Sequence, residues 1–200
     1  MSTEARDQES AKAVFREVVS LLEGHDLPYA VGGSLATHHW TDSSASIGDV
    51  DILIRESDGP DILRLLGRED FETQEMAHSW LHKAFKSAVT VDLMFRLKND
   101  ATLDGDLVKH RSRVEMLGTV AYVMAVEDQI AALAATVDRQ TVGEHWYSIV
   151  DLMASNDLDW DYLAKRLQGD PLRAISVLYF ALGEEVPVEK RVLEKLTSLL

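Results

Sequence analysis

The chain has 200 residues, of which 46% are hydrophobic and 27% are charged, and its formal net charge at pH 7 is −14. This balance is typical of a globular protein that forms one compact domain or two small lobes. The negative charge argues against broad nucleic-acid binding, which needs basic surface, and the lack of cysteine excludes disulfides, thiolate metal sites and a cysteine nucleophile.

The first ten residues are polar and acidic, without the basic-then-apolar order of a secretory signal. The longest apolar run, residues 174–182, is too short to cross a membrane. We therefore expect a cytoplasmic protein with no membrane partner.

Up to about residue 125, short strand-like runs alternate with turns. In chain order, the predicted elements are a helix at 10–24, a strand at 27–31, a helix at 34–40, a strand at 49–54, a helix that opens at 57–60, strands at 71–76, 81–86 and 89–95, and a hairpin of 113–117 with 120–124 around Gly118 and Thr119.

From residue 126 onward the pattern changes to successive helices, predicted near 126–139, 144–154, 158–168, 170–182 and 187–199. The chain is therefore expected to be an α+β protein divided into residues 1–125 and a C-terminal helical region, residues 126–200.

Two carboxylates stand side by side in the strand predicted at 49–54. Residues two apart in a strand point to the same face, so Asp49 and Asp51 project together while Val50 and Ile52 enter the core. Adjacent carboxylates repel each other. Divalent cations remove that repulsion, and Mg²⁺ prefers oxygen ligands of this kind.

A third carboxylate, Asp92, is the one acidic residue in the apolar or hydroxyl-bearing strand predicted at 89–95. An ionised side chain there needs a partner or an edge position. If this strand lies beside the strand of Asp49 and Asp51, all three carboxylates converge. That arrangement suits two Mg²⁺ ions that assist in-line attack on a phosphate.

The sequence Gly32-Gly33-Ser34 links a predicted strand to the start of a predicted helix. Glycines let the backbone approach a phosphate closely, and a helix N-terminus offers free N–H groups to an anion. Ser34 adds a hydroxyl donor. No lysine follows the glycines, so this is not a Walker loop. A plain structural turn remains the alternative.

Together, Val31-Gly32-Gly33-Ser34, Asp49-Val50-Asp51-Ile52 and Val91-Asp92-Leu93 resemble the signature of the DNA polymerase β-like nucleotidyltransferase superfamily. The resemblance covers roughly the first half of the chain. It implies a mixed sheet flanked by helices, a catalytic domain over residues 1–125, and transfer of a nucleotide from an NTP with Asp49, Asp51 and Asp92 as metal ligands and catalytic residues.

The second half is similar to the helical region of AbiEii/MenT-type toxins and related small bacterial nucleotidyltransferases, through the acidic-apolar helix 126–135, Arg139, and His145 before Asp151-Leu152. The resemblance implies that Arg139, His145 and Asp151 face the cleft; a local pairing role for Asp151 is the alternative. The chain departs from the family pattern in two places, because it has no lysine near Leu133 and no basic residue directly before Asp49.

On this reading an NTP lies against Gly32, Gly33 and Ser34, and Lys83 on a central strand either neutralises its triphosphate or sits on an exposed strand face. The sequence leaves the identity of the acceptor open. The toxin resemblance implies tRNA and a cognate antitoxin partner, whereas the same catalytic half also occurs in enzymes that modify small antibiotics. A catalytically weakened interaction module is a further alternative, given the missing basic residues.

Overall fold

The computed structural model describes residues 3–43, 48–76, 79–136 and 142–200. A mixed sheet lies at its centre, with the strand order β3-β4-β5-β2-β1-β7-β6. Its strands are β1 (Tyr29–Val31), β2 (Asp49–Ile54), β3 (Glu72–Gln74), β4 (Leu81–Lys86), β5 (Val89–Met94), β6 (Ser112–Met116) and β7 (Thr119–Val123). The pairs β2–β5 and β1–β7 are parallel, and the other neighbours run antiparallel.

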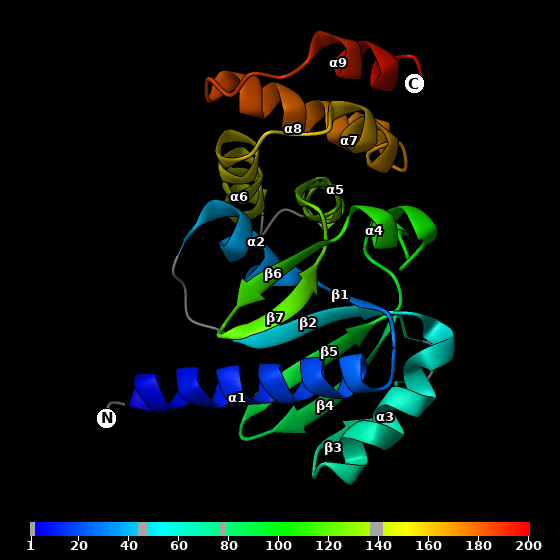
Figure 1. The fold of residues 1–200 in the computed structure, drawn as a ribbon. Coiled ribbons are helices and arrows are strands. Elements are labelled where there is room, and N and C mark those ends of the chain that lie inside the picture. Colours follow the sequence, from blue (N-terminus) through cyan, green and yellow to red (C-terminus); the bar gives the residue numbers. More distant parts are fainter. Residues whose placement is uncertain (1–2, 44–47, 77–78, 137–141) are drawn as a thin grey trace.

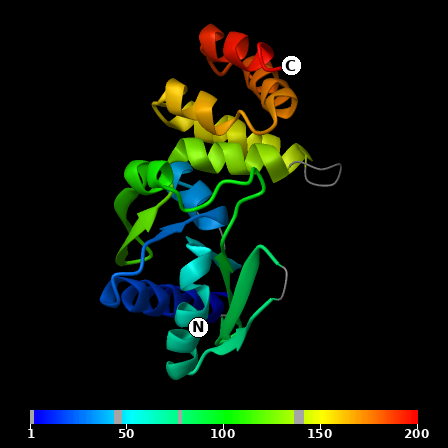
Figure 2. The same ribbon diagram turned by 90° about the vertical axis from the view of Figure 1, so that its right-hand side faces the viewer.

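The helices that accompany the sheet are α1 (Thr3–Gly24), α2 (Gly33–Thr41), the short 3-10 helix η1 (Glu56–Asp58), α3 (Gly59–Arg68) and α4 (Gly105–His110). The second half contributes α5 (Val126–Thr136), α6 (Val142–Ser155), α7 (Trp160–Arg166), α8 (Pro171–Gly183) and α9 (Lys190–Thr197). Helices α1 and α3 pack against the sheet, and α6 to α9 stack at the opposite end of the molecule beyond α5 (Figures 1 and 2). None of the described helices is long and apolar enough to span a membrane.

The described residues form two hydrophobic cores, one in each half of the sequence. The first contains buried residues between Ala11 and Met124, from the sheet and its helices. The second contains buried residues between Val126 and Leu196, from the helices that follow. The half-buried Trp40 of α2 packs against both cores, and its indole N–H donates to the carbonyl oxygen of Met124 at 3.0 Å. Helix α2 therefore connects the two cores.

The predicted α+β fold is confirmed, and the strands 49–54 and 81–86 have the predicted bounds. The hairpin turn lies at Leu117 and Gly118, both with positive φ, one residue before the predicted position. Helix α4 was not predicted from the sequence. It is a short helix whose first turn is capped by the Asp104 carboxylate, which accepts a hydrogen bond from the Leu107 N–H at 2.8 Å. Residues 137–139 of the predicted helix 126–139 lie outside the described residues.

Candidate functional site

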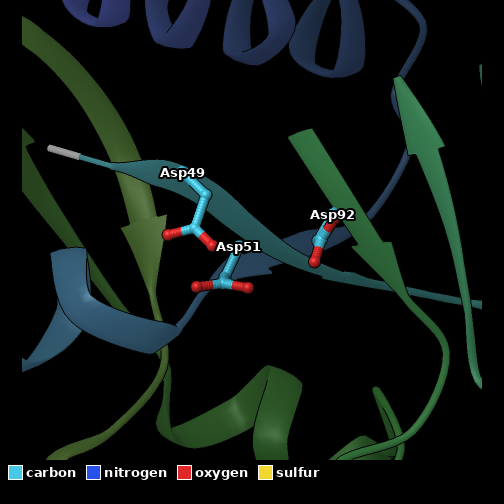
Figure 3. A group of neighbouring side chains, drawn as sticks. All are labelled: Asp49, Asp51 and Asp92. Atoms are coloured by element: carbon cyan, nitrogen blue, oxygen red, sulfur yellow. The ribbon is translucent and has the colours of Figure 1, made fainter. Parts of the chain in front are cut away.

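The two strands that carry the acidic residues are neighbours in the sheet. Strand β2 pairs in parallel with β5, and the register places Asp51 directly opposite Asp92. Because Asp49 precedes Asp51 by two residues, its side chain emerges on the same face. One carboxylate oxygen from each of Asp49, Asp51 and Asp92 lies within 4.8 Å of the other two, and the three side chains gather at one place (Figure 3). The convergence that the sequence predicted on condition of this pairing is therefore present.

The three carboxylates differ in their environments. Asp49 is exposed, Asp51 is half-buried, and the Asp92 side chain is 14% exposed. Burial, followed by the negative charges of Asp49 and Asp92, raises the pKa of Asp51 to about 7, although the charge of Lys83 acts to lower it. Full ionisation of this cluster needs added positive charge. A set of oxygen ligands that repel one another fits a hard divalent cation such as Mg²⁺.

Lys83 lies on β4, directly opposite Asp92 on β5. Its ammonium group donates to the Asp92 carboxylate at 2.7 Å, and its side chain is 31% exposed. From the sequence, Lys83 was expected either to neutralise the triphosphate or to lie on an exposed strand face. In the structure it contacts the third carboxylate, on the flank of the cluster opposite to Ser34, because β4 and β1 lie on different sides of β2 and β5. The contact with the triphosphate stays a prediction.

The glycine turn lies against the acidic cluster. The Gly32 N–H donates to the carbonyl oxygen of Asp51 at 3.0 Å, and Gly33 has a φ of +59°. A Cβ atom on Gly33 would lie 1.9 Å from the Oδ2 atom of Asp51, so no other residue fits there without moving the backbone. Ser34 follows in the first turn of α2 and is half-buried. The turn thus brings the N-terminus of α2 to the carboxylates.

Gln129 of α5, which the sequence analysis did not single out, fixes this turn from the helical half. Its Nε2 atom donates to the carbonyl oxygen of Gly33 at 3.0 Å and to the hydroxyl of Thr37 at 2.9 Å. Gln129 is only 2% exposed. A glutamine on the apolar face of a helix was the available sequence signal, because a buried amide needs hydrogen-bond partners.

The two acidic residues of the same helix have structural contacts. The Glu127 carboxylate accepts from the backbone N–H of Asp159 at 2.7 Å, before α7 begins. Asp128 is fully buried, accepts from the Tyr162 hydroxyl at 2.8 Å and pairs with Arg166. The acidic-apolar pattern of this helix, which contributed to the toxin resemblance, thus corresponds to packing within the helical half.

A pocket of about 130 Å³ opens beside Asp51, between the end of β5 and helix α5. Its walls include Trp80, Met94 and Leu97. Lys98 also lines it, with its ammonium group 4.6 Å from the centre of the Trp80 ring. These residues were not predicted as part of the site, because none belongs to a motif and their contact with α5 depends on the tertiary structure.

The remaining predicted residues concern the segment before and within α6. Arg139 lies outside the described residues. His145 is half-buried in the first part of α6. Asp151 is exposed and lines a groove of about 290 Å³ between α2 and α6, which Thr37 and His38 also line. This groove reaches the turn of Gly33 through Thr37, whose hydroxyl donates to the Gly33 carbonyl oxygen at 3.2 Å.

Comparison with known families and structures gives one clear match over most of the chain. A family model described as uncharacterised nucleotidyltransferase matches residues 2–186. No curated protein sequence matches this chain.

The fold is similar to that of several solved structures. The solution structure of the antibiotic-resistance factor ANT(2'')-Ia has 12% identity and a TM-score of 0.62, over 89% of this chain and 97% of that one. The complex of ANT(2'')-Ia with adenylyl-2''-tobramycin has 11% identity and a TM-score of 0.59, over 78% and 94%. The lincomycin-bound lincosamide antibiotic adenylyltransferase LnuA has 13% identity and a TM-score of 0.53, over 72% and 97%. At these identities the similarity concerns the fold.

Proposed function

The chain belongs to a family of uncharacterised nucleotidyltransferases, and from this premise we propose that it moves a nucleoside monophosphate from an NTP to an acceptor hydroxyl, with Mg²⁺ held by Asp49, Asp51 and Asp92. The observation that carries the proposal is the convergence of these three carboxylates beside the Gly33 turn. Phosphoryl transfer needs both features, because it requires a cation site and a backbone segment that can approach the phosphates closely.

In the proposed reaction, the phosphates of the NTP lie over Gly32, Gly33 and Ser34 at the N-terminus of α2. The acceptor oxygen forms a bond to the α-phosphorus, the bond to the β-phosphate oxygen breaks, and pyrophosphate leaves. Asp92 accepts the proton of the acceptor hydroxyl. Bound Mg²⁺ supplies stabilisation of the negative charge on the transferred phosphate, and three carboxylates offer enough oxygen ligands for two ions.

We assign the chemistry to residues 1–125 and a supporting role to the helical region, residues 126–200. The two hydrophobic cores and the contact of Gln129 with Gly33 support this division. Arg139 and His145 are proposed to reach the NTP, on the resemblance to AbiEii/MenT-type toxins. A cytoplasmic location belongs to the proposal because NTPs are available there.

For the acceptor, a small hydroxylated molecule is favoured over RNA. The net charge of −14 repels a polyanion, and RNA binding normally requires basic surface that releases counterions. The structural neighbours named above are described with tobramycin and lincomycin, which are small molecules. A tRNA acceptor, with an antitoxin protein as partner, is the alternative that the experiment has to separate.

To test this, purified protein is incubated with labelled NTPs and MgCl₂. The acceptors supplied are a panel of aminoglycosides and lincosamides or, in a separate reaction, total tRNA. We expect label on a small molecule, and none with Asp51→Asn, whose circular dichroism should match that of the parent. Asp157→Asn, at an exposed position in the α6–α7 connection, is the matched control and should keep full transfer.

Full transfer by Asp51→Asn would overturn the assignment of the site. Labelled tRNA would establish the toxin alternative. Binding of NTP with Mg²⁺, but no transfer to any acceptor, would favour an interaction module.

A further inference from the structure

The sheet order separates two flanks of the acidic cluster. Strand β1, which leads into Gly33 and Ser34, lies on one side of β2, and β5 with Asp92 lies on the other. Strand β4 follows beyond β5, and Trp80 immediately precedes it. The Trp80 carbonyl oxygen accepts from the Phe95 N–H at 2.9 Å, which fixes this position beside the end of β5.

If the NTP phosphates occupy the flank of Gly33 and Ser34, the acceptor must approach from the opposite flank. In-line attack requires the incoming oxygen and the leaving oxygen to lie on opposite sides of the phosphorus. The pocket extends from Gly33 and Asp51 toward that flank, where Met94 and Leu97 after Asp92 and Trp80 before β4 form its walls. This step depends on the proposed function.

The chemistry of the pocket is mainly apolar. Ala132 and Leu133 of α5 face Met94 and Leu97 across it, and Trp80 adds an aromatic ring. Lys98 lies over that ring and is the basic residue among the residues that line the pocket. Such walls favour a ligand with a planar or aliphatic apolar part.

Gln129, which also lines the pocket, has a side-chain amide whose orientation is set by its contacts. Gly33 offers Gln129 a carbonyl oxygen, which only accepts, so the Nε2 atom of Gln129 must face it. The Oε1 atom is left buried, and it has no hydrogen-bond partner among the described residues. Because this oxygen has almost no accessible surface, it does not reach the space that a ligand would fill, and Gln129 acts on the pocket by holding the Gly33 turn.

We propose that this pocket is the acceptor subsite, and that the acceptor is a small hydroxylated molecule with a planar apolar group that packs on Trp80. The hydroxyl to be modified lies toward Asp92, and the apolar group lies between Trp80 and α5. The proposal deepens the proposed function, because it specifies the acceptor class for the same site.

The test compares two sugars that differ in one group, 4-nitrophenyl β-D-glucopyranoside and methyl β-D-glucopyranoside. Calorimetric titration into the protein without nucleotide measures the pocket independently of transfer. We expect the aryl glucoside to bind about tenfold more tightly, since stacking and burial of one ring supply that much. Trp80→Ala should remove the difference, and Trp80→Phe should keep most of it.

Ala132→Phe, which fills the pocket from α5, gives a second variant that leaves Trp80 in place. It should weaken aryl binding by about tenfold or more. Leu172→Ala, at a 63% exposed position on α8, should leave the binding of both sugars unchanged. Thermal melting of each variant checks that it is folded.

Equal binding of the two glucosides, no detectable aryl binding at millimolar concentration, or an aryl preference that survives both pocket variants would overturn the proposal. So would transfer to an aminoglycoside or tRNA at a rate that Trp80→Ala leaves unchanged. Failure of the proposed function would give a different result. The protein would then not bind Mg²⁺ with NTP, or would transfer nucleotide to no acceptor, while it still bound the aryl glucoside more tightly than the methyl glucoside in the absence of nucleotide.

Discussion

The Cβ position of Gly33 lies 1.9 Å from the Oδ2 atom of Asp51. This relationship joins the turn that we assign to phosphate binding with the central carboxylate of the cluster. Any side chain on Gly33 must displace either the turn or the carboxylate, and the positive φ adds strain.

Gly33→Ala is therefore expected to reduce transfer by at least a hundredfold and to lower the unfolding free energy by about 1–3 kcal/mol. Denaturant unfolding and the labelled-NTP assay measure the two effects. Gly67→Ala in α3 is the matched control, because its Cβ would meet nothing within 4 Å and alanine suits a helix interior. Unchanged activity in Gly33→Ala would contradict the role of the turn.

The stability of the metal-free protein should depend on the titration of Asp51. The folded pKa of about 7 lies above the ordinary value of 3.8, with burial as the main cause and the charges of Asp49 and Asp92 next. Between these values the folded state holds a proton that the unfolded state has released. The contribution of Asp51 to stability is thus complete below about pH 4 and is lost as the pH rises to 7.

Asp51→Asn keeps a neutral group at every pH. Its melting temperature in EDTA should therefore rise relative to that of the parent protein between pH 4.5 and 7.5 and level off above that range. For Asp157→Asn, the difference in melting temperature from the parent protein should be small and constant over this pH range. A constant difference for Asp51→Asn as well would show that the Asp51 pKa is not raised.

Lys83 neutralises part of the acidic cluster through its 2.7 Å contact with Asp92. Lys83→Met removes this cation, so we expect Mn²⁺ to bind about fivefold more tightly in calorimetry without nucleotide, while the metal-free protein melts at a lower temperature. Lys109→Met, at an exposed position on α4, is the control. Weaker Mn²⁺ binding would contradict the expectation, and a higher NTP Kd would favour the predicted contact of Lys83 with the triphosphate.

Arg166 is the partner of a fully buried carboxylate. Its side chain is 8% exposed, its Nε lies 2.5 Å from Asp128, and its Nη1 lies 3.0 Å from Asp104. Burial raises the pKa of Asp128 to about 6 even though Arg166 lowers it. Arg166→Met leaves the buried Asp128 carboxylate without its positively charged partner and should lower the unfolding free energy by about 3 kcal/mol.

The control for Arg166 is Lys190→Met, which removes the ion pair of Lys190 with Glu194, where the side chains are 89% and 63% exposed. An exposed pair of this kind contributes at most about 0.5 kcal/mol. Denaturant unfolding measures both variants. Equal losses in the two would show that the buried pair contributes no more than a surface one.

The three acidic residues were predictable from the sequence because the patterns that mark them are local, whereas their convergence depends on the pairing of β2 with β5. A period of two along a strand places Asp49 and Asp51 on one face, and an isolated acidic residue in an apolar strand marks Asp92. The glycine turn between a strand and a helix was predictable for the same reason. The contact of this turn with Asp51 was not predictable from the sequence, because that contact depends on β1 lying next to β2.

Only the tertiary structure decided which side chains surround that cluster. The placement of Lys83 on Asp92 follows from the β4–β5 register, and the contact of Gln129 with Gly33 joins residues 96 positions apart. The pocket at Trp80 requires β4, β5 and α5 to meet. The sequence by itself determined the candidate carboxylates and the turn, because strand and turn geometry act over a few residues. Strand order and helix packing, which act over the whole chain, decided that Lys83 lies beside Asp92 and that a pocket opens at Trp80.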